Sequence, residues 1–432
     1  MEAVAYQTKL KISPFSIPNI PLKAFKPPKT MRVASLFSGC GGLDLGFTGG
    51  FTFRKFTFPE LPYKIVFSND FDKDAVKVYN ANKQYFKDHS ITHADIRGIN
   101  EAEVPRFDIL LAGFPCQPFS NAGNREGLKD RHGRGTLFYE CVRILSGCKK
   151  ATDNAMPMAF VFENVRGILS TTMPDGTSVP DEIVKQMKKL GYNTSYQLIN
   201  ASEFGVPQNR YRVIMIGIRE DLPPFNFNLF DEILYENRLP SSKVNKYELT
   251  LGSILSDIPN NAPNRHDLWN YSPSGQKMIE LIGPCLDGKE ALAKFKKGLT
   301  LDKISHTISS GKSWKNINPS EMTPRFKKIY DNPVKYHAPN FYRRFALGEI
   351  CGTITASGQP ENSGITHTYE NRRFSVREIA RIQSFPDDFE FPHDSISSAY
   401  KVIGNAVPPI LGWVIGKALR EHLERIDYEL NT

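Results

Sequence analysis

The chain has 432 residues, of which 40% are hydrophobic and 23% are charged, a composition typical of a water-soluble globular protein of two domains rather than one. It contains no apolar run of transmembrane length and no N-terminal apolar core of a secretory signal. The net charge of +9, with a sequence pI of about 9.0, suits a polyanionic partner without proving one.

The first predicted strand, residues 32–37, leads into a glycine-rich loop at residues 38–42, SGCGG, and then into a helix start. We expect residues 1–30, rich in Pro and Lys, to lie outside the fold. Strand, glycine loop and helix is the arrangement with which open α/β sheets hold nucleotide-like cofactors. The loop lacks the third glycine of a dinucleotide fingerprint and the Gly-Lys-Ser/Thr ending of a phosphate-binding loop. A tight turn without a ligand is the alternative.

A Phe-rich insertion at residues 48–62 precedes the second predicted strand, residues 64–69, which ends in Asp70. An acid at this position can accept two hydrogen bonds from a ribose diol, although Asp70 could instead cap the helix predicted at 74–82, a position that Asp72 could equally occupy. Phe71 could cover an adenine ring. Asp95 is a candidate acceptor for an exocyclic amine, and a solvated loop acid is the alternative.

Cys116 follows a short apolar strand at residues 109–112, directly after Gly113-Phe114-Pro115. A lone cysteine is most often a small core residue. A thiol where a buried strand gives way to a long polar loop is, however, well placed for nucleophilic chemistry. The six cysteines form no CxxC pair and no Cys/His metal spacing, so we expect neither zinc nor disulfides, and a reducing compartment.

Further strands are predicted at residues 157–162, 192–200 and 212–218, with helices at 135–145 and 181–190. Glu163 closes the first of these strands, at the sheet edge where Cys116 emerges. Arg210 and Arg212, two residues apart on extended chain, are predicted to face the same way. They could bind phosphate or carbonyl oxygens, or form surface salt bridges.

The composition changes after residue 221, where the sequence becomes rich in Asn, Pro and Ser. Lys and Arg exceed Asp and Glu over residues 291–350, among the aromatic residues Trp314, Tyr330, Tyr336, Phe341 and Tyr342. This mixture is typical of a nucleic-acid surface, with a solvated basic surface as the alternative. A strand at 349–357, a helix at 372–385 and a last helix ending near 423 complete the prediction.

Taken together, the motifs resemble the DNA (cytosine-5) methyltransferases, chiefly the single-chain bacterial enzymes of restriction-modification systems. The matching stretches occur in the family's order: FSGCGGLDLGF (37–47), NDFD (69–72), GFPCQPFS (113–120), GTLF (135–138), ENV (163–165), QNRYR (208–212), RRFSVREIARIQSFPDDF (372–389) and GNAV (404–407). Residues 1–30, 48–62 and 221–345 carry none of these motifs.

The resemblance implies that S-adenosyl-L-methionine methylates C5 of a cytosine, leaving S-adenosyl-L-homocysteine, without a metal. Cys116 would add to C6 and turn the ring into an enamine that attacks the methyl group. Glu163 would hold the N3 and N4 edge, Arg212 the O2 side, and Arg210 the backbone phosphate or the catalytic loop. Because C6 is inaccessible inside a duplex, the cytosine would be flipped out.

The family's cofactor contacts fall on residues of the glycine loop, the second strand, the cysteine strand and the last motif. They are Phe37 and Phe71 for the adenine, Asp70 for the ribose, Asp95 and Ile96 for the amine edge, Gly39, Gly41 and Gly42 for the methionine part, and Gly113, Pro115, Leu137, Asn405 and Ala406 for the rest of the pocket. DNA contacts are expected from Gln117, Ser120, Arg131, Arg134, Thr353 and Thr355. The chain departs from the family in having Asp70 for the usual Glu, and Ala406 where many members have Ser.

The fold class implied is α/β, a Rossmann-like S-adenosylmethionine-dependent methyltransferase sheet with a second, smaller DNA-recognition domain. We expect an N-terminal extension (1–30), a catalytic and cofactor-binding domain (31–220, completed by 398–432) and a target-recognition domain (221–397). Double-stranded DNA is the expected partner of a monomer in the bacterial cytoplasm. A cognate restriction endonuclease would act separately, and the sequence does not decide whether one exists.

Two alternatives stay open. A branch of the same family methylates transfer RNA, although the long motif-free region favours DNA. A member that has lost catalysis would only bind DNA, although Cys116, Glu163 and Arg212 argue for an active enzyme. A nicotinamide dehydrogenase is excluded by the missing GxGxxG and by the lack of a catalytic histidine arrangement.

Overall fold

The computed structural model of the protein describes residues 26–115, 137–151, 156–173, 175–285, 311–332, 342–357 and 365–431. The largest element within them is a seven-stranded sheet of order β5-β4-β1-β6-β7-β10-β8. Its strands are β1 (Met31–Leu36), β4 (Tyr63–Asp70), β5 (Thr92–His93), β6 (Ile109–Ala112), β7 (Ala159–Val165), β8 (Tyr192–Asn200) and β10 (Tyr211–Arg219). The first five in the sheet order pair in parallel, and β10 runs antiparallel to β7 and β8. The predicted α/β class is confirmed.

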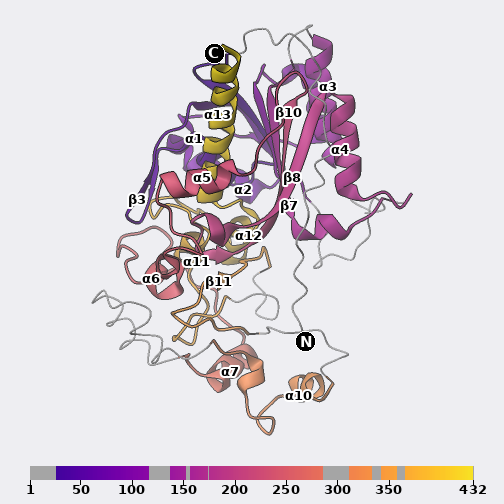
Figure 1. Ribbon diagram of the computed structural model, residues 1–432. Helices are drawn as coiled ribbons and strands as arrows, with labels where there is room; N and C mark the ends of the chain where they lie inside the picture. Colours follow the sequence, from indigo (N-terminus) through magenta and orange to yellow (C-terminus); the bar gives the residue numbers. More distant parts are fainter. Residues whose placement is uncertain are drawn as a thin grey trace.

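Two hydrophobic cores flank this sheet, because successive strand residues point to opposite faces. In β6, Ile109 and Leu111 enter one core and Leu110 and Ala112 the other, and all four are fully buried. The first core is covered by α1 (Gly42–Thr48), α2 (Lys73–Ala81) and α13 (Pro409–Asn431), and the second by α3 (Leu137–Ala151) and α4 (Val179–Lys189). Figure 1 shows α1 and α13 on one side of the sheet and α3 and α4 on the other.

The last helix returns to the glycine-loop helix at the start of the fold. A Cβ added to Gly46 of α1 would lie 2.5 Å from the Cα of Gly412 in α13, so the two helices touch through their backbones. The segment from α12 (Ile396–Asn405) through α13 is apolar enough to cross a membrane by length and composition, but the window concerned is 89% buried inside the protein. Core packing accounts for its apolar character.

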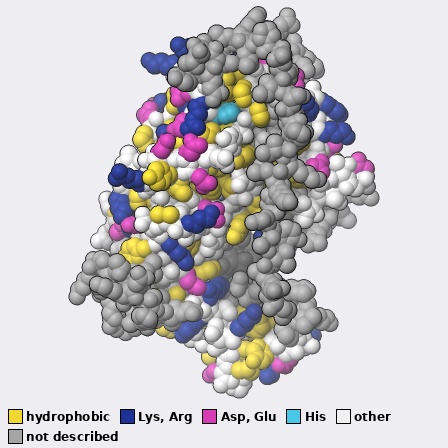
Figure 2. Space-filling view, viewed as in Figure 1, with side chains coloured by type: hydrophobic (Ala, Val, Ile, Leu, Met, Phe, Trp, Pro, Cys, Tyr) yellow, Lys and Arg dark blue, Asp and Glu magenta, His cyan; other side chains and the backbone are white. Residues whose placement is uncertain are grey.

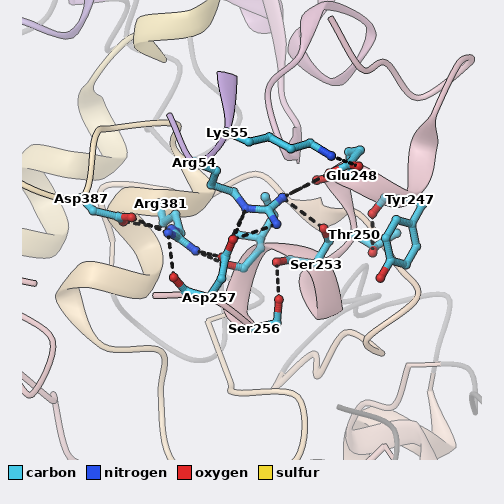
Figure 3. A network of polar contacts seen from close by, with 11 residues as sticks. Arg54, Lys55, Tyr247, Glu248, Thr250, Ser253, Ser256, Asp257, Arg381 and Asp387 are labelled. Atoms are coloured by element: carbon cyan, nitrogen blue, oxygen red, sulfur yellow. Dashed lines mark hydrogen bonds and ion pairs between the residues drawn. The ribbon is translucent and has the colours of Figure 1, made fainter. Parts of the chain in front are cut away.

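The insertion at residues 48–62 forms a hairpin of β2 (Phe51–Phe53) and β3 (Phe56–Phe58), and Phe58 packs edge-on against Trp413. Its turn residue Arg54 has a positive φ of 54° and reaches Ser253 and Asp257, at and just beyond α6 (Leu251–Leu255). Asp257 also pairs with Arg381 of α11 (Val376–Ile382) (Figure 3). The hairpin thus ties the beginning of the fold to helices far away in the sequence.

A third hydrophobic core lies apart from the sheet, around α7 (Pro273–Ile282), η9 (Trp314–Asn316) and α10 (Pro324–Asp331) (Figure 1). The first core, which α1, α2 and α13 cover, also contains buried residues of 222–254, among them those of α5 (Leu229–Glu236), and of 351–391. The separate core is therefore narrower than the predicted domain at 221–397. The remaining short helices are η1 (Lys83–Phe86), η2 (Ile96–Gly98), η3 (Glu101–Glu103), η6 (Arg166–Ser170), η7 (Ala201–Phe204) and η8 (Lys246–Leu249).

The predicted basic and aromatic surface at 291–350 is wrong for several of its residues that the structure describes. Trp314 and Tyr342 pack inside the third core, where their large apolar rings leave water. Arg344 is fully buried and donates to the carbonyls of His367 and Glu370. In Figure 2, basic and acidic side chains are interspersed over the described part of the visible face. Tyr336 and Phe341 lie outside the described residues.

The strand predicted at residues 349–357 is also wrong over most of its length. Only β11 (Cys351–Gly352) is a strand, and it pairs in parallel with β9 (Gln208–Asn209). Beyond it, the Ile354 amide donates to the side chain of Gln208, which replaces the strand ladder. The apolar pattern there reflects burial of Cys351 and Ile354 in the core rather than a regular sheet.

Candidate active site at the carboxyl edge of the sheet

Glu163 and Arg212 meet where β7 ends and β10 begins. The two strands are antiparallel, with Val165 opposite Arg212, and Nε of Arg212 lies 2.7 Å from Oε1 of Glu163. Both residues are less than one-tenth exposed, and burial lowers the pKa of the Arg212 guanidinium while Glu163 opposes that shift. The structure therefore brings the predicted carboxylate and guanidinium together.

Both side chains keep a polar atom free for a ligand. Among the described residues, Oε2 of Glu163 and Nη2 of Arg212 have no hydrogen-bond partner, while Nη1 of Arg212 donates to the Tyr211 carbonyl at 2.7 Å. A carboxylate oxygen and a guanidinium nitrogen side by side match an amidine-like edge next to a carbonyl oxygen. Such an edge is present on cytosine.

The strand that precedes Cys116 ends beside this pair. β6 and β7 are parallel neighbours, and a Cβ on Gly113 would lie 3.8 Å from Oε2 of Glu163. Phe114 is buried against Phe162, and its carbonyl accepts a 3.3 Å hydrogen bond from the side-chain nitrogen Nδ2 of Asn164. The chain is thus held next to Glu163 up to Pro115. Five predicted residues beyond it lie outside the described residues: Cys116, Gln117, Ser120, Arg131 and Arg134.

The glycine loop and the end of β4 form a second part of the same edge. Phe37, Gly39 and Gly41 have positive φ angles of 55°, 57° and 87°. Asp70 binds the loop through a 2.8 Å hydrogen bond from the Gly39 amide, and it also accepts from the Asp72 amide at 2.8 Å. Asp70 therefore orders the glycine loop, and burial raises its pKa.

The glycine loop contacts two other predicted cofactor segments, the end of β4 at Asp70 and the GNAV segment at 404–407. A Cβ on Gly42 would lie 2.2 Å from the Val407 carbonyl, so the loop touches the GNAV segment that holds Asn405 and Ala406. Asn405 ends α12 and is exposed, whereas Ala406 is buried and its carbonyl accepts from Arg210 and Gln383. The Ala406 carbonyl, one of the backbone groups that could contact a cofactor, is therefore already hydrogen-bonded within the protein.

The residues predicted around an adenine are placed less uniformly. Phe71 is 72% exposed, which leaves its ring free to stack. Asp95 caps η2 and binds Arg97 through both carboxylate oxygens, which lowers its pKa, so an amine contact would have to share this carboxylate. Ile96 is buried in the core beside α3, and Leu137, the first residue of α3, is partly buried against the same core.

The comparisons with known proteins agree with this geometry. Residues 31–421 match the family model described as C-5 cytosine-specific DNA methylase. The chain belongs to this family. It is a DNA (cytosine-5) methyltransferase of the type found in bacterial restriction-modification systems, whose members use S-adenosylmethionine.

Curated relatives cover almost the whole chain. The type II methyltransferase M.FnuDI of Fusobacterium nucleatum is 31% identical over 403 residues, covering 93% of this chain and 98% of that protein. M.NgoPII of Neisseria gonorrhoeae is 30% identical over 403 residues, covering 91% and 97%. The solved Dnmt2 methyltransferase of S. pombe, 15% identical with a TM-score of 0.51 and covering 90% of this chain and 99% of that one, shares the fold.

Arg210 differs from its prediction. Its guanidinium is fully buried and donates to the carbonyls of Ile354 at 2.8 Å, Gly404 at 2.9 Å and Ala406 at 3.1 Å. Nη1 and Nη2 are taken by these carbonyls, and the buried Nε has no partner among the described residues. The alternative contact predicted for Arg210, with the catalytic loop, falls outside the described residues. The structure thus gives Arg210 a framework position, joining β9 to the end of α12, and leaves Arg212 at the open edge.

Thr353 and Thr355, the predicted DNA contacts after β11, lie next to this framework. The Thr353 hydroxyl donates to the Asn209 carbonyl at 2.8 Å and the Thr355 hydroxyl to Ser357 at 3.0 Å. A Cβ on Gly404 would lie 2.3 Å from the Thr355 carbonyl, so this segment packs directly on α12. Their contact with DNA stays a prediction.

Two residues at the edge were not predicted from the sequence. Arg166 follows β7 and Tyr211 begins β10, and both are exposed beside the buried pair. Successive side chains of a strand point to opposite faces, so Tyr211 faces away from the buried Arg210 and Arg212, and this spacing could have predicted its exposure. Among the described residues, no group of three or more His, Cys, Asp and Glu could hold a metal ion.

Proposed function

We propose that the protein methylates C5 of a flipped-out cytosine within a specific short duplex DNA sequence, through a covalent bond between Cys116 and C6. The observation that carries this proposal is the Glu163–Arg212 pair. Among the residues that the structure describes, one oxygen and one nitrogen of the pair have no partner, at the edge where the chain leads toward Cys116. The family membership supplies the reaction class.

The residues divide the reaction between them. The Cys116 thiolate adds to C6 with its own electron pair, and the pair of the C5–C6 double bond moves to C5, which takes the methyl group. Glu163 holds the proton at N3 and accepts from N4, so that negative charge does not build up on the ring, while Arg212 donates to O2. Loss of the C5 proton to water or hydroxide and departure of the thiolate restore the aromatic ring.

Base flipping follows from the position of the pair. Glu163 and Arg212 are less than one-tenth exposed, so a cytosine inside a stacked duplex cannot reach them. An enzyme that works on a base in such a recess must take it out of the helix. The predicted loop residues Gln117, Ser120, Arg131 and Arg134 are proposed to close over the DNA around it.

The chain's residues fit S-adenosyl-L-methionine, which supplies an electrophilic methyl group when bound. The left-handed backbone at Gly39 and Gly41 turns the loop tightly beside Asp70, which accepts from the Gly39 amide. We assign Asp70 to the ribose hydroxyls, because a carboxylate oxygen can accept a further hydrogen bond. The exposed ring of Phe71 offers a face for the adenine. Gly113 and Pro115 are proposed to complete the cofactor pocket.

The remaining features of the proposal concern the substrate and the cell. Target recognition is assigned to residues 221–397, beside a catalytic domain of 31–220 completed by 398–432. The enzyme acts on DNA in the bacterial cytoplasm. It acts as a monomer, because its target is one base on one strand. A restriction endonuclease of the same sequence specificity would act separately.

The experiment is covalent trapping. Duplex DNA in which 5-fluorocytosine replaces cytosine should form a gel-stable adduct in the presence of S-adenosyl-L-methionine, because fluorine cannot leave as a proton does. The Cys116→Ser variant should form none. Bisulfite sequencing of plasmid from an expressing host would first identify the site. An adduct with Cys116→Ser, or methylation of transfer RNA but not of duplex DNA, would overturn the proposal.

A further inference from the structure

We infer that Arg166 and Tyr211 form a phosphate-binding platform that positions the target DNA strand beside the Glu163–Arg212 pair. This inference rests on the proposed function and names two positioning residues for it. The platform consists of the Arg166 guanidinium, the Tyr211 ring beneath it and the Tyr211 hydroxyl.

The register of the sheet builds this platform at the edge of the site. Val165 pairs with Arg212, so the next residues outward on the two antiparallel strands are Arg166 and Tyr211. The Arg166 guanidinium carbon lies 5.7 Å from the centre of the Tyr211 ring, within the range of a cation–π contact. The platform is thus one residue step outward from Arg212 and three from Glu163.

The Tyr211 backbone is fixed by the active-site arginine. Nη1 of Arg212 donates to the Tyr211 carbonyl at 2.7 Å, while Nε of the same guanidinium binds Glu163. Any displacement of Tyr211 therefore moves a contact of Arg212. Docking on the platform and placement of the base are linked through one side chain.

Within the described part of the chain, no acidic side chain neutralises the charge of the platform. Among the described residues, Arg166 has no ion pair or hydrogen bond, and the Tyr211 hydroxyl has no partner. Most other described arginines have carboxylate or carbonyl partners, such as Arg219 with Asp221 or Arg143 with Glu101. An exposed guanidinium and hydroxyl side by side supply donors for the oxygens of one phosphate.

A purely structural pair is the competing explanation. A cation–π contact between two exposed residues would only stiffen the start of η6. The two explanations differ in their readouts, because a stiffening contact changes stability, whereas a phosphate contact changes the salt dependence of DNA binding. Arg106 provides the matched control. It is exposed, has no partner among the described residues, and precedes β6 at the opposite edge of the sheet.

The test measures DNA affinity of the full chain from 50 to about 250 mM salt, for duplexes with and without the methylation site. Arg166→Ala should weaken both duplexes about equally, by roughly fivefold to tenfold at low salt, and reduce the salt slope by about one. Arg106→Ala should match wild type. Arg166→Lys should restore most of the slope. KM for DNA should rise in Arg166→Ala, with kcat and the unfolding temperature unchanged.

A double-mutant cycle then tests whether the two residues act together. Tyr211→Ala should weaken DNA binding by part of the amount that Arg166→Ala does. The double variant should lose less binding free energy than the sum of the losses in the two single variants. An Arg166→Ala slope equal to that of wild type and Arg106→Ala would overturn the inference, as would additive effects in the cycle. If wild type neither methylates duplex DNA nor forms the 5-fluorocytosine adduct, the proposed function fails first.

Discussion

The arginines behind the sheet edge differ from those on it. Arg210 and Arg377 are fully buried, and each donates to three main-chain carbonyls, those of Ile354, Gly404 and Ala406 and those of Pro263, Pro386 and Phe389 respectively. Arg212 has one carboxylate and one carbonyl, and Arg166 has neither among the described residues. A fully buried guanidinium bound to several main-chain carbonyls holds the fold, whereas one with unpartnered donors at the open edge is available to a substrate.

Replacing Arg210 should have the largest effect on the frame. Arg210→Ala removes a donor from three buried carbonyls, of which that of Ala406 keeps the side chain of Gln383, and this should lower the free energy of unfolding by ~3–5 kcal/mol. Thermal unfolding, compared with wild type and with Arg212→Ala, measures it. A stable but inactive Arg210→Ala protein would break the comparison and return Arg210 to the chemistry.

Asp44 offers a pH test on the cofactor side. It is fully buried, with only the Ser35 and Tyr79 hydroxyls as side-chain partners, and burial raises its pKa to about 6. The folded protein therefore holds this proton more tightly than the unfolded chain, and the associated stability is lost as pH rises from about 4 through 6. Asp44→Asn cannot ionise, so it should exceed wild type by up to ~3 kcal/mol at pH 8 and by about half as much at pH 5.

Denaturant unfolding of both proteins at the two pH values measures this effect. Equal differences at pH 5 and pH 8 would show that hydrogen bonding, and not ionisation, decides the outcome.

The hairpin compares a buried and an exposed cation that bind the same acid. The side chains of Arg54 and Lys55 are 9% and 61% exposed, and both pair with Glu248 (Figure 3). Arg54→Ala also removes the donors to Asp257 and Ser253 and should cost ~1–3 kcal/mol, whereas Lys55→Ala should cost under ~0.5 kcal/mol because a surface pair is screened. Similar losses of unfolding free energy in both variants would contradict the distinction.

Phe71 should affect cofactor binding and leave stability unchanged. Its ring is 72% exposed, so Phe71→Ala should leave the unfolding temperature unchanged. Loss of stacking should weaken S-adenosyl-L-methionine binding by about tenfold, ~1.4 kcal/mol. Titration calorimetry with the cofactor measures this directly. Unchanged affinity would remove Phe71 from the site.

Much of the fold was predictable because buried strands carry a signal that tertiary packing does not override. The strand predicted at 192–200 is β8 with the same bounds, and the one at 64–69 lies within β4. The glycine loop, Asp70 and Glu163 were found from motifs, and the structure does bring Gly113, Glu163 and Arg212 to one edge.

What failed depended on partners distant in the chain. Arg210 and Arg212 have the same spacing and chemistry, and only the approach of residues 354 and 404–406 makes one of them structural. Trp314 and Tyr342 could not be separated from surface aromatics until the third core was seen. The reach of Arg54 across about 200 residues to Asp257 leaves no local pattern.

The most direct test of the account is Glu163→Gln, followed by methyl transfer to duplex DNA and thermal unfolding of the same preparation. Gln can still accept from Arg212 but cannot hold a proton at N3 as a carboxylate does. We expect methyl transfer to fall by about 10²- to 10⁴-fold, with a smaller loss of stability than Arg210→Ala shows. Methyl transfer within about threefold of wild type would contradict the role given to the Glu163–Arg212 pair.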